Sequence, residues 1–330
     1  MALDFDSNAS VAKNSTTKIG DEGHLSTANI AISTTFIVII MVLSFLGNML
    51  VLLAFKRFRY IRSVTNFFVV SLAVTDLLVA VLAMPFWVFH LTRGPVTGAI
   101  VRIWTATDIL VSVSSIWHLS FVSIDRFLCI SNPFKYPLLM TSRRAVVIIT
   151  GIWVYSVIVA VMSQVLWAWD PFPLFVTVLN FIIPSVIIMI MYFNIFRIAR
   201  YQAKQIEMTI NGTTRSFSLS AEMKAAKVLG VVIGAFLACL SLFFALNLKY
   251  YFCRCFPPLL LVAMAKWLHY GNSVINPILY GLLNKDFKSA FKRILSPHGL
   301  LITSDVIFSY KSGNTSAFSM ELTKQRQVEQ

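Results

Sequence analysis

Two acidic side chains stand on one apolar segment that is long enough to cross a membrane. Asp108 lies near the start of residues 101–130, and Asp125 stands next to Arg126 near its end. An ionised carboxylate inside a bilayer is costly, so it needs a partner or a function. The two sites are 17 positions apart, roughly 25 Å along a helix. This layout indicates a helix that receives a cation on one side of a membrane and reports on the other.

The composition predicts that this segment belongs to a membrane protein. The chain is 57% hydrophobic and 13% charged, whereas soluble domains carry about 25% charged residues. Runs of about 20 apolar residues can each span a bilayer, and backbone groups in lipid must be satisfied within helices. We therefore predict an all-α protein, a seven-transmembrane helix bundle. The predicted spans are residues 29–55, 66–91, 101–130, 145–167, 172–195, 225–252 and 258–283, the last of which begins weakly.

The net charge of +14 predicts how the spans are oriented. The basic residues cluster in the segments after the first, third, fifth and seventh spans, which all lie on one side if the count is seven. Such clusters mark the cytoplasmic side. The chain is accordingly expected to lie in the plasma membrane, in contact with lipid, with its N-terminus outside the cell. Nucleic-acid binding is not expected of so apolar a chain.

Four regions follow from this topology. Residues 1–28 form the expected extracellular tail, with glycosylation acceptor patterns at Asn8 and Asn14. Residues 29–283 form the bundle. Residues 284–296 carry apolar side chains at helical spacing between basic ones, which predicts an amphipathic helix on the inner membrane surface. Residues 297–330 are polar and predict a disordered cytoplasmic tail.

An ordered set of motifs gives the chain a family resemblance. The motifs are Gly47-Asn48, residues 72–76 (LAVTD), Asp125-Arg126-Phe127, Trp153, Pro184, Tyr192, Phe243-Phe244 and residues 276–280 (NPILY). Together they resemble rhodopsin-like (class A) G-protein-coupled receptors over nearly the whole chain. Within that family the chain is most similar to aminergic receptors. Residues 115–126 and 194–207 resemble trace-amine receptors, and residues 62–68 are closer to dopamine receptors.

The resemblance implies a ligand site around Asp108, whose carboxylate matches the amine-binding position of aminergic receptors. The aromatic side chains expected to surround the ligand cation are Phe243, Phe244, Trp267 and Tyr270. In the fifth span, Val176, Thr177 and Asn180 stand where catecholamine receptors carry serines, so simpler amines are the expected ligands. The alternative for Asp108 is a structural carboxylate paired with Lys266 or another internal group.

A second buried carboxylate and an inner ion pair complete the resemblance. Asp76, Ser115, Asn272 and Asn276 resemble the sodium site of the family, with Na⁺ as an allosteric ion; the alternative is a protonated aspartate satisfied by hydrogen bonds. Arg126 is expected to pair with Asp125 and Glu222 and to release them when a heterotrimeric G protein binds; the alternative is an ordinary surface salt bridge. Tyr192 and Tyr280 resemble the tyrosines that support the open form. No other cofactor and no further metal is expected.

Three positions depart from the family pattern. Val101 stands where a cysteine usually bridges to the second outer loop, and residues 169–171 contain no cysteine, so that disulfide cannot form. Cys253 and Cys255 could bridge locally, though in a strained loop. Leu240 replaces the usual Trp of the sixth span and Leu242 the usual Pro, so that helix is expected to be straighter.

These features leave several readings of function open. The first is an amine receptor coupled to a G protein, with raised cyclic AMP implied by resemblance. The alternative is a receptor-like protein that binds amines but signals poorly or constitutively, given Val101, Leu240 and Leu242. A retinal protein needs a lysine where Tyr270 stands, and Lys266 is one turn further out. Broken helices or repeats typical of transporters and the residue patterns of an enzyme are not seen, so no catalytic residue is assigned.

Overall fold

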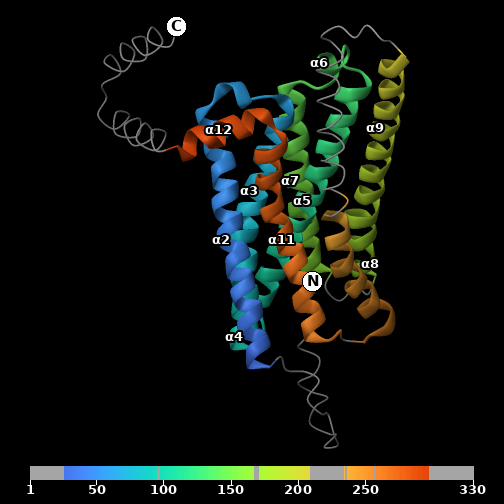
Figure 1. The fold of residues 1–330 in the computed structure, drawn as a ribbon. Helices are drawn as coiled ribbons and strands as arrows, with labels where there is room; N and C mark the ends of the chain where they lie inside the picture. Colours follow the sequence, from blue (N-terminus) through green and yellow to red (C-terminus); the bar gives the residue numbers. More distant parts are fainter. Residues whose placement is uncertain are drawn as a thin grey trace, which may run out of the picture.

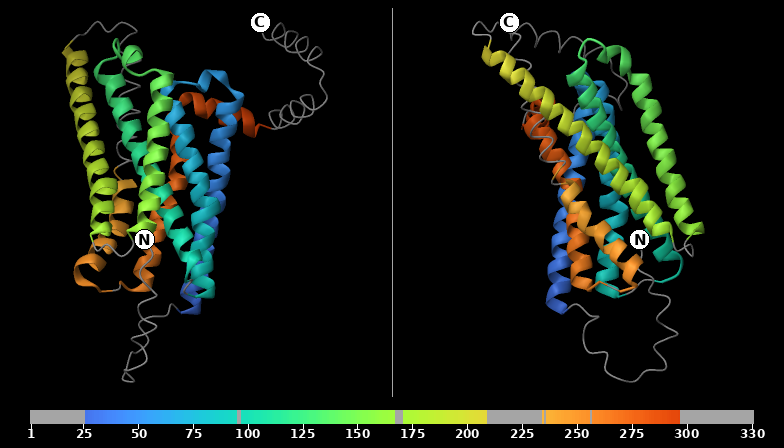
Figure 2. Two further views of the ribbon diagram at one scale, coloured as in Figure 1. Left: turned by 180° about the vertical axis from the view of Figure 1, so that it is seen from behind. Right: turned by 90° about the vertical axis from the view of Figure 1, so that its right-hand side faces the viewer.

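The computed structural model describes residues 26–94, 97–166, 171–208, 234, 236–255 and 257–296. All regular structure in these ranges is helical. Figure 1 shows long helices running side by side, with α12 lying across one end of the bundle. Figure 2 shows α9 inclined relative to α2. The longer helices are α2 (Thr27–Arg57), α3 (Val64–Leu78), α4 (Met84–Arg93), α5 (Ala99–Ser131), α7 (Ser142–Val165), α9 (Ile183–Met208) and α11 (Leu259–Leu283).

The predicted helical bundle is confirmed. Six of the described helical stretches are long and apolar enough to cross a membrane: 27–57, 64–93, 99–131, 142–165, 172–198 and 236–253. Helix α11, predicted as the seventh span, is not among them. It carries an inward row of buried polar side chains, among them Lys266, His269 and Asn272, and it packs against α2.

Two of the spans contain π-helical turns next to a proline. The second span joins α3 to α4 through Val79–Ala83, just before Pro85, and the fifth joins α8 (Phe172–Thr177) to α9 through Val178–Ile182, just before Pro184. Proline has no N–H for the helix ladder, and a wider turn accommodates the break. Asn180 lies in the second of these turns, so the turn helps to set where its side chain points.

A proline in α11 produces a contact between two helices that are distant in sequence. Pro277 cannot donate to the carbonyl of Ser273, and the side-chain amide of Asn48 donates to that oxygen instead, at 3.0 Å. A Cβ added at Gly47 would lie 2.9 Å from Pro277 Cβ. The glycine therefore lets α2 approach α11 closely. This contact sets the position of α11 along the bundle axis, and with it the positions of its polar residues.

The helix after the seventh span begins at a defined cap. The Asn284 side chain accepts hydrogen bonds from the backbone N–H groups of Asp286 and Phe287, and α12 follows over Lys285–Leu295. Phe287 is fully buried against the inner ends of α2 and α3, together with Val51 and Val69. The amphipathic helix predicted over residues 284–296 is therefore present. The tails predicted over residues 1–28 and 297–330 lie outside the described residues, apart from the start of α2.

The short helix α6 (Tyr136–Leu139) lies between α5 and α7. Thr141 caps α7 by accepting from the Arg144 N–H, and the Arg144 guanidinium donates to the carbonyls of Leu138 and Leu139 at 2.9 and 2.7 Å. These bonds tie the end of α6 to the start of α7. They hold Tyr136 where it can contact the inner end of α5.

The structure shows how the residues that depart from the family pattern are packed. Leu240 is buried among Ile116, Ile188 and Phe244, so a branched aliphatic side chain fills the space under the ligand site. The sixth-span helix runs unbroken through Leu242 over residues 236–253. Cys253 and Cys255 are not joined by a disulfide in the structure, so the local bridge considered from the sequence is absent.

Candidate ligand site

Asp108 is buried, and its carboxylate already has a cationic partner. The Lys266 Nζ lies 2.6 Å from Asp108 Oδ2, and the Tyr270 hydroxyl donates to Oδ1 at 3.1 Å. Asp108 is 2% exposed and Lys266 3%. A short, shielded ion pair of this kind is a strong charge-assisted hydrogen bond. The structure thus contains the internal pairing that the sequence offered as the alternative role for Asp108.

Aromatic rings surround the Lys266 ammonium on several sides. Its Nζ lies 4.7 Å from the ring centre of Phe243, 5.2 Å from Tyr270, 5.4 Å from Trp104 and 5.9 Å from Trp87. Rings at these distances stabilise a cation through their π faces. Two of the rings expected around a ligand cation, Phe243 and Tyr270, therefore surround a cation of the protein itself.

The other two aromatic residues of the expected ligand site make different contacts. Phe244 stacks on Phe181 of the fifth span, with ring centres 4.3 Å apart. Trp267 points toward α2, where its Nε1 donates to Ser33 Oγ at 2.8 Å and its ring packs against Phe36. Trp267 is therefore turned toward α2 rather than toward Asp108, whereas Phe244 lines the cavity described next.

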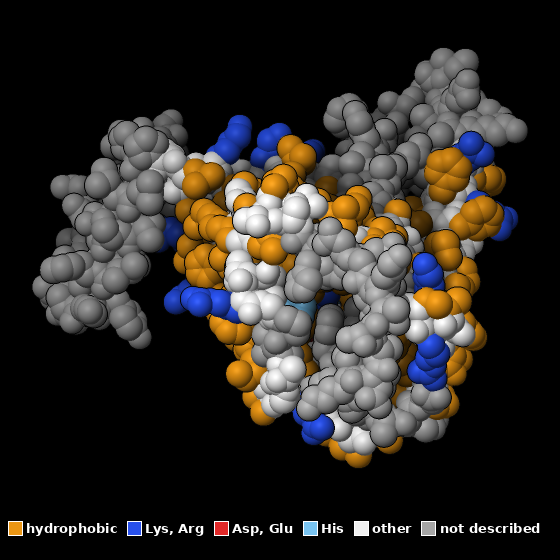
Figure 3. Space-filling view, turned by 90° about the horizontal axis from the view of Figure 1, so that it is seen from below, with side chains coloured by type: hydrophobic (Ala, Val, Ile, Leu, Met, Phe, Trp, Pro, Cys, Tyr) orange, Lys and Arg blue, Asp and Glu red, His pale blue; other side chains and the backbone are white. Residues whose placement is uncertain are grey.

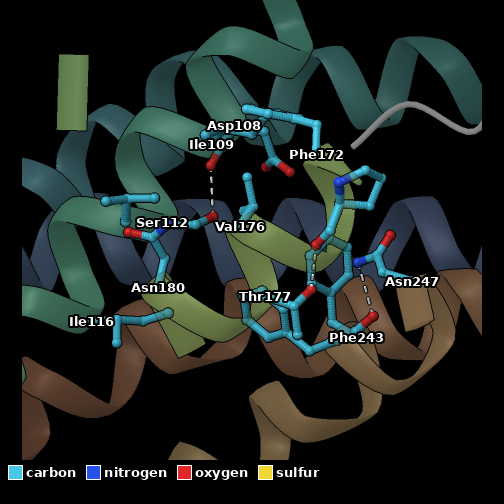
Figure 4. Close-up of a pocket in the computed structure, with 13 residues that line it drawn as sticks. Asp108, Ile109, Ser112, Ile116, Phe172, Val176, Thr177, Asn180, Phe243 and Asn247 are labelled. Carbon is cyan, nitrogen blue, oxygen red and sulfur yellow. Dashed lines mark hydrogen bonds between the residues drawn. The ribbon is translucent and has the colours of Figure 1, made fainter. Parts of the chain in front are cut away.

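A cavity of about 40 Å³ lies beside Asp108, between α5, the fifth span and the sixth-span helix. Figure 4 shows the side chains that converge on it. A water needs roughly 10–15 Å³ of such volume, so the cavity has room for only a few waters, and an aromatic ligand needs side chains to move. The lining residues are Asp108, Ile109, Ser112, Val113, Ile116, Phe172, Pro173, Val176, Thr177, Asn180, Phe243, Phe244 and Asn247.

The fifth-span residues expected to face the ligand, Thr177 and Asn180, both line this cavity. The Thr177 hydroxyl donates to the Pro173 backbone carbonyl at 2.8 Å, and the side-chain Oδ1 of Asn180 accepts from Trp117 Nε1 at 3.4 Å. Both are buried. On the α5 side, Ser112 bonds to His269 of α11 at 3.1 Å. Neither His269 nor Ser112 was singled out from the sequence, because a lone histidine at helical spacing is not distinctive.

The second buried carboxylate lies deeper in the bundle. Asn276 Nδ2 donates to Asp76 Oδ2 at 2.8 Å. Asn272 is buried, and its amide oxygen and nitrogen both lack hydrogen-bond partners among the described residues. Ser115 is half-buried. Carboxylate and amide oxygens are hard donors, so Asp76 and Asn272 fit a small cation such as Na⁺. No group of three or more His, Cys, Asp or Glu that could hold another metal occurs in the described part of the chain.

At the inner end of α5, Asp125 is held by uncharged partners. Thr65 of α3 and Tyr136 of α6 both donate to its carboxylate, the latter at 2.7 Å. Arg126 Nε lies 4.0 Å from Asp125 Oδ2, at the limit of an ion pair. Burial first, and then the bond to and charge of Asp125, raise the pKa of Tyr136 above its ordinary value. Tyr136 therefore remains a proton donor at neutral pH.

The remaining predicted residues are placed as follows. Tyr192 packs in the cluster around Ile130 and Ile195, and Tyr280 packs against Phe287 with ring centres 5.7 Å apart. Glu222, the expected inner partner of Arg126, lies outside the described residues, as do Asn8 and Asn14. Sequence reasoning missed Thr65 and Tyr136. The short distance of eleven positions between Asp125 and Tyr136 is the one signal that could have suggested their contact.

The fold and the buried charges describe a helical membrane bundle with a polar site at its outer half and a charged inner end. Residues 47–173 and 172–280 match the family model of the 7 transmembrane receptor (rhodopsin family). The chain belongs to this family, and it is a multi-pass membrane receptor rather than an enzyme.

Individual relatives support the narrower resemblance to aminergic receptors. The chain is 33% identical over 337 residues to the D(1)-like dopamine receptor of Oreochromis mossambicus, covering 90% of this chain and 87% of that protein. It is 34% identical to the D(1) dopamine receptor of Carassius auratus, covering 79% and 86%. It is 30% identical to the octopamine receptor beta-2R of Chilo suppressalis, covering 80% and 79%. The class A, aminergic resemblance predicted from the motifs is confirmed by these relatives.

Proposed function

We propose that this protein is a plasma-membrane receptor that binds a protonated amine at Asp108 and signals through a heterotrimeric G protein. One observation carries the proposal: Asp108 is a buried carboxylate beside a mostly apolar cavity, and it already binds an ammonium group. A site that holds the ammonium of Lys266 has the charge, the hydrogen-bond donor Tyr270 and the aromatic surroundings that a ligand ammonium needs. The named ligands of the relatives, octopamine and dopamine, are such amines.

Signalling is proposed to run along α5 to its inner end. In this structure Asp125 is bonded to Thr65 and Tyr136, and Arg126 is only loosely paired. A partly exposed arginine at the inner end is a ready contact for a G protein. Exchange of partners around Asp125, with Glu222 as a second partner of Arg126, is the two-state element that a ligand biases. The expected output is a rise in cyclic AMP, and the N-terminal tail is extracellular with Asn8 and Asn14 glycosylated.

Na⁺ is proposed as an allosteric ion at Asp76. The partnerless amide of Asn272 supports this, since a buried polar group without a partner is costly and an ion with its waters would satisfy it. Asp76 would supply the negative charge, and Ser115 and Asn276 further oxygen atoms. A bound ion would hold the surrounding helices apart and so oppose their inward movement.

The test is cyclic AMP in transfected cells exposed to primary, tertiary and di-amines. Wild type, Asp108→Asn and Asp286→Asn are compared at equal surface expression. Asp286 is exposed on α12, so its exchange is a matched control for the loss of a carboxylate. A response that disappears in Asp108→Asn and persists in Asp286→Asn supports the proposal. A response that survives in Asp108→Asn removes Asp108 from the mechanism.

A second candidate is a receptor-like protein that binds amines but signals poorly or constitutively. The internal Asp108–Lys266 pair favours this candidate, because an ammonium of the protein occupies the position of the agonist. The unbroken sixth-span helix through Leu242 and the buried Leu240 point the same way. In the same assay this candidate predicts ligand-independent cyclic AMP, or amine binding without any change in cyclic AMP.

A further inference from the structure

The buried pair between Lys266 and Asp108 sets a condition on any ligand of this site. A plain amine that takes Asp108 must displace the Lys266 ammonium, which then stays buried without its counter-charge. Breaking a buried ion pair by removing one partner is strongly unfavourable. No other described carboxylate can replace Asp108, because Asp76 is bonded to Asn276 deeper in the bundle and Asp125 is at the inner end.

Lys266 has no easy route to water. Its side chain is 4% exposed, and the rings of Trp87, Trp104, Phe243 and Tyr270 surround its ammonium. Rings alone compensate only part of the lost ion pair. A ligand that brings its own anionic group next to its ammonium removes this cost, because each of the two buried charges then keeps a counter-ion.

The cavity and the ion pair are adjacent, so a single small molecule can reach both charges. Asp108 lines the cavity directly. Phe243 also lines it, and its ring is the one closest to the Lys266 ammonium. A ligand that separated the two charges would gain space on the α11 side, where Lys266 now lies against Asp108. The rest of the lining is mostly apolar, with Ile109, Val113 and Val176 available for a hydrocarbon or aromatic group.

The exposed charged residues that the structure describes at the outer end of the bundle are basic. Figure 3 looks onto this end and shows hydrophobic side chains with Lys and Arg at the edges. The exposed charged residues described near it are Arg93, Arg102, Lys249 and Arg254. Among the described residues, Asp108 is the acidic group in this half of the molecule, and it is buried. Such a surface attracts carboxylates and repels simple cations.

We propose that the ligand class of this site is a zwitterionic amine, that is, an amino acid with an apolar or aromatic side chain. Its ammonium pairs with Asp108 and Tyr270, its carboxylate pairs with Lys266, and its side chain fills the cavity toward Val176 and Phe244. This inference rests on the proposed function, since it keeps Asp108 as the ammonium site. It differs in making Lys266 a part of the ligand site that determines specificity.

The test measures direct binding to purified receptor in lipid nanodiscs by titration calorimetry. Three probes share a phenyl ring: phenethylamine, phenylalanine and 4-amino-3-phenylbutanoate, which sets its two charges further apart. For wild type we expect the better zwitterion to bind at least about tenfold more tightly than phenethylamine. Lys266→Met, which keeps the length and loses the charge, is expected to reverse this order. Lys266→Arg is expected to preserve it.

Lys288→Met is the matched control, because Lys288 is an exposed lysine on α12 outside the cavity, and its order of affinities should equal that of wild type. Tighter binding of phenethylamine than of both zwitterions to wild type overturns the proposal, while leaving the amine-receptor function intact. An unchanged order in Lys266→Met also overturns it. If Lys266→Met does not fold, the wild-type order and Lys266→Arg decide. Binding of none of the three probes to wild type rejects the zwitterion, and the cyclic AMP panel then decides the amine function separately.

Discussion

The Asp108–Lys266 pair should appear as a large coupling in a double-mutant cycle of stability. For unit charges 2.6 Å apart, Coulomb's law gives about 6 kcal/mol at an effective dielectric constant of about 20. Desolvation of both groups offsets much of this. The measurable effect of removing one partner is the cost of leaving the other charge buried without a counter-charge, which is about 3–5 kcal/mol.

We therefore expect Lys266→Met and Asp108→Asn each to lower the free energy of unfolding by about 3–5 kcal/mol. In Lys266→Met, Asp108 keeps the Tyr270 hydrogen bond but no cation. The double variant should lose much less than the sum, because it buries no unpaired charge. We expect a coupling energy of at least about 2 kcal/mol, near the upper end of what contacting residues show.

The assay is equilibrium unfolding of the ligand-free receptor in mixed detergent micelles, followed by tryptophan fluorescence. The chain has seven tryptophans, and Trp87 and Trp104 pack beside the ion pair. Lys249→Met in the same cycle measures the effect of removing an exposed lysine, which should be within about 0.5 kcal/mol of zero. Additive losses in the Asp108–Lys266 cycle would refute the reasoning, since they mean the two charges do not stabilise one another.

Three further predictions concern the inner end and the middle of the bundle. Tyr136→Phe removes a hydrogen bond to the charged Asp125 and should lower the free energy of unfolding by about 1.5–3 kcal/mol. It should also raise basal cyclic AMP. Unchanged basal cyclic AMP would show that the Tyr136–Asp125 bond has no part in activation. Gly47→Val places a side chain against Pro277 and should lower thermal stability and surface expression, whereas Gly151→Val, at an open position on α7, should not. Asp76→Asn should abolish any stabilisation of the ligand-free receptor by NaCl relative to KCl; a sodium effect that persists in this variant would place the ion elsewhere.

Much of the fold could be predicted from the sequence because the bilayer imposes strong rules. The apolar runs locate the helices to within a few residues, as in the third span, predicted at 101–130 and observed as α5 over 99–131. The apolar spacing after residue 284 likewise predicts α12, whereas its cap by Asn284 emerged only from the structure. The π-helical turns in the second and fifth spans were not predicted, since Pro85 and Pro184 show where the ladder breaks but not how the chain accommodates the break.

The composition of the candidate site was harder to predict, because it depends on rotation of whole helices. Lys266 and Tyr270 are four positions apart and so share a face of α11, which is why both reach Asp108. Trp267 directly follows Lys266, about 100° further around the helix, and is turned toward α2, where Ser33 Oγ accepts a hydrogen bond from its indole N–H. Sequence alone does not show which of these two faces is turned to the ligand.

The two carboxylates of α5, those of Asp108 and Asp125, both have partners within the protein, and this constrains how a signal can pass. Asp108 binds Lys266 and Tyr270 at the outer half, and Asp125 binds Thr65 and Tyr136 at the inner end. A ligand that only added contacts to this arrangement would stabilise it and leave the inner end closed. Activation requires a ligand that binds better once Lys266 has left Asp108, because only a difference in affinity between two states shifts their populations. Under the proposed function, the buried lysine acts as an internal competitor, and the chemistry that displaces it sets which ligands activate the receptor.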